Sequence, residues 1–292
     1  MTRLGFGASG PWAMPWFPEA RALAVLRAGL DAGIADIDTG PSYAGGHAEP
    51  RLGRLLARLA AEGHAAPRLS SKVGTRAGAD GKVVKDFTEA AMDRQLEESL
   101  AALGTDRLDV LYLHGPRARE LAEALPWAAQ QKAAGRIGAV GVCADGAHVR
   151  AAIRPGVDWI MAPYNALAQH NRAGLREARG AGIQLATVAP LAQAAWRRDI
   201  LLPRGPVSAW YAARALLRGR PNLAAARRAR WLREVPRWSP AALSLAFVRA
   251  TLAPDLVLTT TTNPEHLRET ADAMARPVPE ALSRRLHGLI VS

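Results

Sequence analysis

The chain has 292 residues, 49% of them hydrophobic, and a formal net charge of +12. This length suits one large domain or two small ones. The single cysteine, Cys143, excludes a disulfide within the chain and fits a reducing compartment. No apolar run reaches the roughly 18 residues of a membrane span, and the N-terminus lacks the basic and apolar regions of a secretion signal. We therefore expect a cytoplasmic protein that makes no membrane contact.

The positive charge comes almost entirely from arginine. It could reflect an arginine-rich composition on a solvated surface, attraction for an anionic ligand such as a dinucleotide, or nucleic-acid binding. The arginines are spread along the chain and are densest between Arg197 and Arg237. They accompany no recognisable nucleic-acid-binding module, so we expect no nucleic-acid partner.

Short apolar runs alternate with longer amphipathic segments along the chain. The runs predict strands at Arg3–Gly7, Ile34–Asp38, Arg68–Lys72, Leu108–His114, Ile137–Val142, Val157–Met161, Ile183–Val188 and Leu256–Thr259. The amphipathic segments predict helices at Glu19–Ala32, Ala48–Ala61, Thr88–Leu103, Arg119–Ala134, Arg172–Ala181, Pro240–Thr251 and Pro264–Ala275. Several of these helices are followed directly by glycine, a common helix stop.

The strands are largely apolar rather than alternating, which indicates a parallel sheet buried on both faces. Eight strand–helix repeats in this length predict an α/β fold, the closed (β/α)8 TIM barrel. The alternative is a doubly wound open sheet. Its glycine-rich turn has a spacing match in Gly5–Gly10, but the following segment, PWAMPWFPE, does not suit a helix N-terminus. We predict one domain over residues 1–292, with a long basic insertion at about 193–238 that contains one or two helices on either face of the barrel.

Four polar residues lie at or just after the ends of predicted strands. Asp38, Lys72 and His114 each close a strand, and Tyr43 follows in the loop after the second strand. The carboxyl ends of the strands of such a barrel face one opening, where the chemistry takes place. Each residue alone would more commonly be a loop anchor, a solvated charge, a structural histidine or a packing tyrosine. Their coincidence at one opening indicates a catalytic site.

An acid, a phenol, an amine and an imidazole can together protonate a carbonyl oxygen while a hydride reaches its carbon. A tyrosine is a weak acid, with a pKa near 10, and a neighbouring Lys72 ammonium should lower that pKa. Asp38 would hold Lys72 by an ion pair, and a neutral His114 would orient the carbonyl. Tyr43 would then donate its proton to the oxygen, or accept it when the reverse reaction oxidises an alcohol.

Several segments resemble the aldo-keto reductase superfamily over nearly the whole chain. They are DTGPSYAGGHAEPRLG from Asp38, SKVGT, ESLAALGTDRLDVLYLHGP, GRIGAVGVCADG and TTTNPEHLRET. By this resemblance Asp38, Tyr43, Lys72 and His114 are the catalytic tetrad, and the hydride donor is a nicotinamide dinucleotide, usually NADPH. The LHGP segment is similar to a bacterial branch of aldose and small-aldehyde dehydrogenases, which implies a small carbonyl compound or sugar as substrate.

The same resemblance implies cofactor-binding positions, at several of which this chain departs from the family. They are Gly7, Ala8, Cys143, Ala144, Met161, Val188, Pro190, Leu191, Thr260, Thr261, Thr262, His266 and Thr270. The family usually has polar side chains at 143 and 144, glutamine at 161 and tyrosine at 188, and cationic groups near the C-terminal segment. We therefore expect weaker cofactor binding and less preference for NADPH over NADH.

Trp12 and Trp16 follow the first strand, where the family often places aromatic substrate walls. His47 could reach the barrel mouth, but its position in a loop favours a solvated histidine. No group of residues has metal-ligand spacing, so no metal site is predicted. Two other functions remain open: a barrel that uses the tetrad for non-redox acid–base chemistry, as an isomerase or lyase with weak or no dinucleotide binding, and a non-enzymatic binding protein. The sequence does not indicate an oligomeric state.

Overall fold

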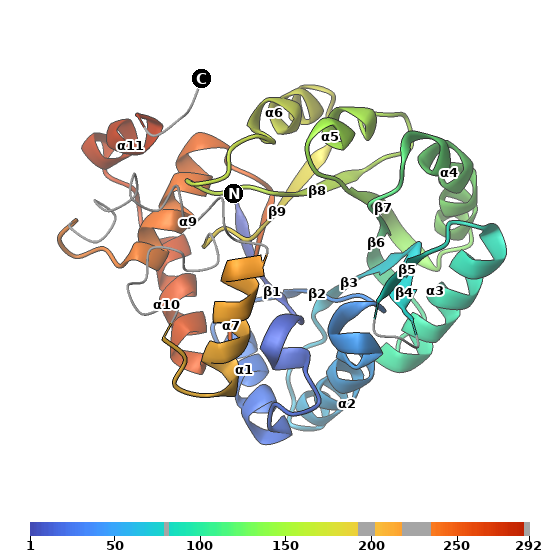
Figure 1. Cartoon of the computed structure of the whole chain (residues 1–292), viewed down its shortest axis with the longest axis horizontal. Coiled ribbons are helices and arrows are strands. Elements are labelled where there is room, and N and C mark those ends of the chain that lie inside the picture. Colours follow the sequence, from blue (N-terminus) through green and yellow to red (C-terminus); the bar gives the residue numbers. More distant parts are fainter. Residues whose placement is uncertain (79–81, 192–201, 218–234, 289–292) are drawn as a thin grey trace.

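The computed structural model describes residues 1–78, 82–191, 202–217 and 235–288. Within them, eight parallel strands close into a barrel in the order β1-β10-β9-β8-β7-β6-β3-β2, and helices surround it (Figure 1). This arrangement confirms the predicted (β/α)8 TIM barrel. A separate two-stranded antiparallel sheet, β4–β5, lies outside the barrel order.

The barrel strands are β1 (Arg3–Gly7), β2 (Asp36–Asp38), β3 (Arg68–Val73), β6 (Leu108–His114), β7 (Ile137–Cys143), β8 (Trp159–Pro163), β9 (Gln184–Val188) and β10 (Leu256–Thr259). The hairpin strands are β4 (Thr75–Ala77) and β5 (Val83–Lys85). The helices are α1 (Glu19–Asp31), α2 (Ala48–Ala61), α3 (Glu89–Leu103), α4 (Ala118–Ala133), α5 (Ala147–Ala151), α6 (Arg172–Gly180), α7 (Pro206–Leu217), α9 (Pro240–Thr251), α10 (Pro264–Ala275) and α11 (Glu280–His287), with 3-10 turns η1 (Gly10–Ala13) and η2 (Tyr43–Gly46).

The predicted barrel strands and their helices are all present, with ends that differ by at most two residues. The β4–β5 hairpin and the short helices α5 and α11 were not predicted from the sequence. Each hairpin strand has three residues, and those of β5 are all exposed, so neither gives a buried apolar run. Hydrophobic periodicity is strong only in longer or more buried elements.

Three helix ends show the expected capping chemistry. The α3 helix ends at Gly104, which adopts the left-handed conformation with φ 67°. The side chain of Ser239 accepts a hydrogen bond from Ala242 N at the start of α9, and that of Asn263 accepts one from Glu265 N at the start of α10. The last of these caps fixes the loop that joins β10 to α10, at the carboxyl end of the barrel.

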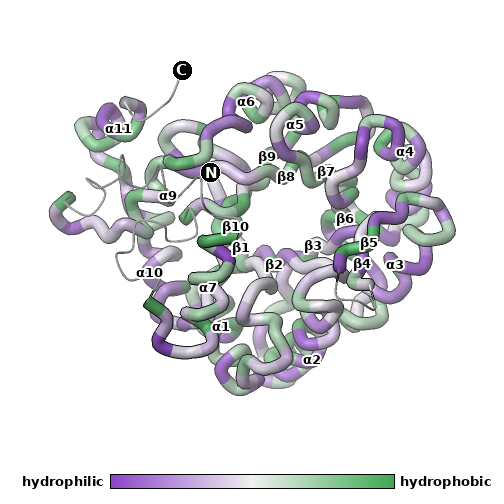
Figure 2. The backbone as a smooth tube through the Cα atoms, viewed as in Figure 1, coloured by the Kyte–Doolittle hydropathy of each residue, from purple (hydrophilic) through white to green (hydrophobic). Residues whose placement is uncertain are grey.

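Two apolar layers hold the fold together. One lies between the strands and the surrounding helices, whose surfaces alternate between hydrophobic and hydrophilic residues (Figure 2). The other fills the barrel, and its buried members are Tyr112, Trp159, Met161, Ala186, Leu256 and Leu258. Within this second layer the Tyr112 ring passes so close to Gly141 that a Cβ there would lie 2.2 Å from a ring carbon. Only glycine fits at position 141, and it lets the Tyr112 ring occupy the barrel interior.

Part of the predicted insertion is described. The α7 helix lies within it. Trp210 of this helix packs next to Gly10, in the segment that follows β1, where a Cβ would lie 3.5 Å from the indole ring. This contact places α7 at the carboxyl end of the barrel. The rest of the predicted basic insertion falls largely on residues 192–201 and 218–234, which lie outside the described residues.

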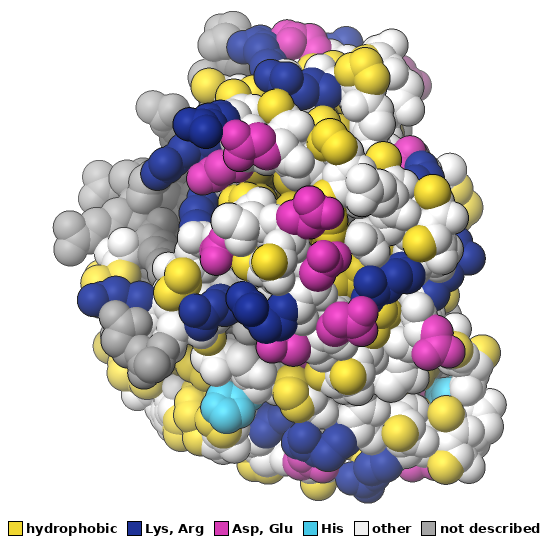
Figure 3. All heavy atoms as spheres, turned by 90° about the vertical axis from the view of Figure 1, so that its right-hand side faces the viewer, with side chains coloured by type: hydrophobic (Ala, Val, Ile, Leu, Met, Phe, Trp, Pro, Cys, Tyr) yellow, Lys and Arg dark blue, Asp and Glu magenta, His cyan; other side chains and the backbone are white. Residues whose placement is uncertain are grey.

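The surface charge is mixed in sign where Figure 3 shows it. Over the side that carries α3 and α4, lysine and arginine side chains are interspersed with aspartate and glutamate. A face of this kind agrees with a solvated surface rather than a basic binding patch. In the described part of the chain, no helix combines the length and the apolar character that crossing a membrane requires.

Candidate active site

Three neighbouring strands bring the four predicted catalytic residues together. The barrel order places β2, β3 and β6 side by side, and their carboxyl ends carry Asp38, Lys72 and His114. Tyr43 begins η2, five residues after Asp38, where Ala44 and Gly45 take positive φ angles of 53° and 68° and turn the chain tightly. The four side chains therefore occupy one end of the barrel.

Asp38 and Lys72 form a buried ion pair. The Lys72 ammonium donates hydrogen bonds of 2.8 and 2.7 Å to the two carboxylate oxygens and one of 2.6 Å to the carbonyl of Thr39. Their side chains are 1% and 4% exposed for Lys72 and Asp38 respectively. Burial opposes the charge on Lys72, but the negative charge of Asp38 outweighs that cost and raises the pKa of the ammonium. Lys72 is therefore protonated throughout the physiological range.

The Tyr43 phenol is held beside this pair. The Lys72 nitrogen lies 4.8 Å from the centroid of the Tyr43 ring. Burial raises the pKa of Tyr43 to about 12, against the lowering effect of Lys72 and with a further rise from Asp38. Lys72 lowers this pKa, as expected, but desolvation of the phenolate exceeds the attraction of one already paired ammonium, so the pKa is raised overall.

His114 completes the group. Its ring centroid lies 6.1 Å from that of Tyr43, with the two rings nearly perpendicular at 83°. Burial, together with the charges of Lys72 and Lys85, lowers the pKa of His114 to about 3. The imidazole is therefore neutral at physiological pH. Its Nδ1 lies 2.5 Å from the Thr75 hydroxyl, a contact that the sequence analysis did not find because β4 was not predicted.

An apolar wall adjoins the tetrad on the β7 and β8 side. The thiol of Cys143 lies 3.8 Å from the Met161 sulfur, and Val188 packs against the same interior cluster. Burial raises the pKa of Cys143 to about 12, so this cysteine is a thiol and not a nucleophile. Ala144 offers only its backbone, and its amide already bonds the Met161 carbonyl. The side chains predicted here to face nicotinamide offer only weak sulfur hydrogen bonds.

Hydroxyl groups gather between the ends of β1 and β10. Thr260 donates a 2.8 Å hydrogen bond to the Gly7 carbonyl and lies 3.3 Å from the Ser9 hydroxyl. Thr261 lies 3.3 Å from His266 Nδ1, next to the N-terminus of α10. These groups and the α10 amides suit a phosphate or ribose. Of the remaining predicted positions, Ala8 and Pro190 are buried, Thr262 and Leu191 are partly buried, and Thr270 is buried with its hydroxyl donating to Leu267 O.

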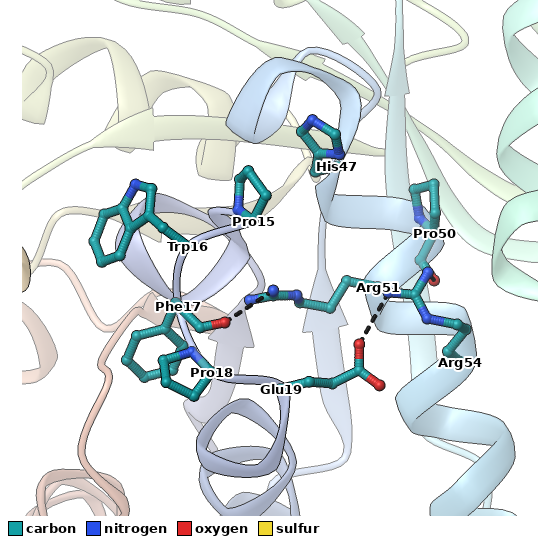
Figure 4. A pocket seen from close by; sticks show the side chains of 9 residues that line it. All are labelled: Pro15, Trp16, Phe17, Pro18, Glu19, His47, Pro50, Arg51 and Arg54. Atoms are coloured by element: carbon teal, nitrogen blue, oxygen red, sulfur yellow. Dashed lines mark hydrogen bonds and ion pairs between the residues drawn. The ribbon is translucent and has the colours of Figure 1, made fainter.

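The two tryptophans predicted to line a substrate pocket lie in different environments. Trp12 is completely buried, and its indole donates a 3.0 Å hydrogen bond to Ala22 O, so it belongs to the core. Trp16 is 44% exposed. It lines a cavity of about 330 Å³ between the segment after η1 and the start of α2 (Figure 4), whose other lining residues are Pro15, Phe17, Pro18, Glu19, His47, Pro50, Arg51 and Arg54. The tetrad residues are not among them.

Arg51 is a buried lining residue of this cavity. Its guanidinium donates hydrogen bonds of 2.7 and 2.9 Å to the carbonyls of Trp12 and Phe17, and it is 6% exposed. These bonds fasten η1 and the segment after it to α2, which follows η2 in the chain. Among the described residues, no three His, Cys, Asp or Glu side chains are placed to hold a metal ion.

Comparisons with known proteins agree with this geometry. The sequence model of the Aldo/keto reductase family matches residues 3–290. In an alignment of 167 residues, the chain is 32% identical to D-threo-aldose 1-dehydrogenase from a Pseudomonas species, and the match covers 48% of this chain and 49% of the relative. It thus spans about half the length of that curated relative.

Solved structures give the same result. An aldo-keto reductase from Klebsiella pneumoniae in complex with NADPH is 25% identical, with a TM-score of 0.70 over 98% of this chain and 90% of that one. Glycerol dehydrogenase from Gluconobacter oxydans, 20% identical, shares the fold with a TM-score of 0.80 over 98% of this chain and 90% of its own. Because the family match spans almost all of the sequence, the chain belongs to the aldo/keto reductase family.

Proposed function

We propose that the protein is an NAD(P)-dependent oxidoreductase that reduces the carbonyl group of a small aldehyde or sugar, or oxidises the matching alcohol. The observation that carries this proposal is the buried Asp38–Lys72 pair beside a protonated Tyr43 and a neutral His114. The similarity to an aldose dehydrogenase supports a sugar or small aldehyde as substrate.

Each tetrad residue has a distinct task in the proposed reduction. Tyr43 holds the proton that the carbonyl oxygen receives, and its raised pKa keeps that proton in place until the substrate arrives. His114, neutral, donates a hydrogen bond that orients the carbonyl and stabilises the negative charge developing on its oxygen. Lys72 then stabilises the phenolate left on Tyr43, and Asp38 keeps that ammonium charged and fixed.

The proposed cofactor is NADPH or NADH, which would supply the hydride. Thr260–Thr262 and the start of α10 would hold its phosphates and ribose, next to Gly7 and Ala8. Cys143, Met161 and Val188 would pack against the nicotinamide ring. Because these three side chains are apolar or carry only sulfur, they suit the face of the ring better than its carboxamide.

The proposed function also assigns roles to the two tryptophans after β1 and a cellular location to the protein. Trp16, which lines the cavity between the segment after η1 and the start of α2, would form a substrate wall, and Trp12 would support it from the core. The partner is a small molecule and not nucleic acid. The protein would act in the cytoplasm, where a single free cysteine remains reduced.

The test is a phenylalanine substitution at the proposed acid. Tyr43→Phe should lower the turnover of a panel of sugars and small aldehydes by at least about a hundredfold, measured as dinucleotide absorbance, while calorimetric binding of the dinucleotide is unchanged. Tyr211→Phe is a matched control, since Tyr211 is also a phenol whose pKa burial raises to about 12 but lies in α7. Full turnover by Tyr43→Phe would contradict the proposal.

A further inference from the structure

A hairpin that the barrel does not require reaches the catalytic histidine. Immediately after β3, Gly74 takes a φ of 86° and turns the chain out of the barrel into β4. Phe87 covers this turn so closely that a Cβ at Gly74 would lie 2.1 Å from its ring, and Asp86 N bonds the Gly74 carbonyl at 3.0 Å. The hairpin is therefore anchored at its base, one residue past the strand that carries Lys72.

Two residues that pair across the hairpin, one from each strand, contact the end of β6. Thr75 of β4 pairs with Lys85 of β5. The Thr75 hydroxyl lies 2.5 Å from His114 Nδ1, and the Lys85 ammonium donates a 2.6 Å hydrogen bond to the Gly115 carbonyl. The hairpin thus makes hydrogen bonds to two consecutive residues, to the side chain of His114 and to the backbone of Gly115.

The direction of the Thr75 hydrogen bond follows from the surroundings of the hydroxyl. Thr75 is 2% exposed, and within the described residues His114 Nδ1 is the one partner of its oxygen. A buried hydroxyl that only accepted would leave its own hydrogen unpaired, at a cost of about 1–3 kcal/mol. The hydroxyl therefore donates to Nδ1, which must carry a lone pair.

A neutral imidazole carries one hydrogen, so a lone pair on Nδ1 places that hydrogen on Nε2. Two positive charges, on Lys72 and Lys85, oppose a second proton on the ring. Nε2 is then the donor that His114 can offer to a substrate oxygen. The opposite tautomer would present a lone pair to that oxygen and repel it.

We propose that Thr75, carried by the β4–β5 hairpin, is a positioning residue that fixes His114 in the tautomer with its hydrogen on Nε2. The chemical use of that hydrogen rests on the proposed function, whereas the tautomer itself does not. The hairpin is on this view a part of the active site, built outside the barrel to set the donor state of one imidazole.

The first test reads the tautomer directly, without substrate or cofactor. Nitrogen NMR of the histidine side chains, with His114 assigned by its loss in His114→Gln, should show a protonated Nε2 and an unprotonated Nδ1 in the wild type. Thr75→Val, which removes the hydroxyl but keeps the shape, should yield a mixture of tautomers, and Thr75→Ser should restore the wild-type spectrum. An unchanged His114 spectrum in Thr75→Val would overturn the proposal, whatever the protein catalyses.

The second test reads the consequence for turnover. Thr75→Val should lower kcat by about tenfold or more, with little change in the KM for dinucleotide, and Thr75→Ser should recover most of the loss. Thr105→Val, the same change on an exposed turn, should have no effect. A tautomer shift with unchanged kcat would overturn the catalytic use of the Nε2 hydrogen while leaving the tautomer assignment, and would count against the proposed function separately.

Discussion

The ammonium of Lys72 lies 4.8 Å from the centroid of the Tyr43 ring, yet the pKa of that phenol is raised to about 12. The reason is that Lys72 is already held by both oxygens of Asp38, so the pair presents little net charge to its neighbour. Burial of the phenolate then dominates. The site stores a proton on Tyr43 rather than a phenolate, which suits the donor in a carbonyl reduction.

This relationship predicts different pH profiles for the two directions of the reaction. Tyr43 remains protonated up to a pKa of about 12, so the rate of carbonyl reduction should stay nearly constant between about pH 6 and pH 9. Alcohol oxidation needs the phenolate, whose fraction rises about tenfold for each pH unit below that pKa, so its rate should rise steadily. Initial rates in both directions test this. A fall in reduction near pH 8 would indicate that Tyr43 ionises much more readily.

The buried ion pair predicts that substitutions of Asp38 and Lys72 have strongly coupled effects on the free energy of unfolding. Lys72→Met should lower the free energy of unfolding by about 3–5 kcal/mol, because it leaves the Asp38 carboxylate buried without a counter-charge. Asp38→Asn should be similarly costly, since it strands the ammonium. The double variant should lose much less than the sum of the two, as urea denaturation of all four proteins would show. Additive losses would mean that the two charges do not depend on each other.

The neutral state of His114 predicts that the folded protein loses stability at acidic pH. The pKa of His114 is about 3 in the folded protein and 6.5 in its ordinary state, so between these values the unfolded chain binds a proton that the folded chain rejects. The stabilisation is fully present above pH 6.5 and is lost as the pH falls toward 3, by on the order of 5 kcal/mol. Urea denaturation of the wild type at several pH values, compared with His114→Gln, isolates this contribution. Parallel curves for the two proteins would refute it.

Most of the fold could be predicted from the sequence because strands buried on both faces give continuous apolar runs, as in Leu108–His114. Several helices between these strands are also followed by glycines, such as Gly104, that mark where they end. The tetrad was readable because strand ends in a barrel converge. The sequence could not show that burial at Tyr43 outweighs the expected lowering of its pKa by Lys72. It also could not reveal Thr75, since the short strands β4 and β5 contain no buried apolar run and nothing in the residue itself indicates its contact with His114.

The apolar wall formed by Cys143 and Met161 predicts weak and unselective dinucleotide binding. In the described part of the C-terminal segment, the one cation among residues 260–270 other than a histidine is Arg268, which is exposed, so few positive groups are placed to distinguish a 2′-phosphate. Titration calorimetry should give dissociation constants for NADPH and NADH that differ by less than about tenfold. Tight binding that strongly favours NADPH would contradict this prediction.

If polar side chains at positions 143 and 161 increase the affinity for dinucleotide, the apolar wall is the cause of the weak binding. Met161→Gln combined with Cys143→Ser supplies hydrogen-bonding groups next to the tetrad, and one or two new bonds of about 1 kcal/mol each should tighten the binding of both dinucleotides by roughly fivefold to thirtyfold. Met274→Gln is a control for the substitution itself, since Met274 is buried in α10, away from the barrel interior. Because the new groups face the nicotinamide and not the 2′-phosphate, the ratio of the two constants should not change. A change in that ratio, with no gain for NADH, would place the weakness at the other end of the cofactor.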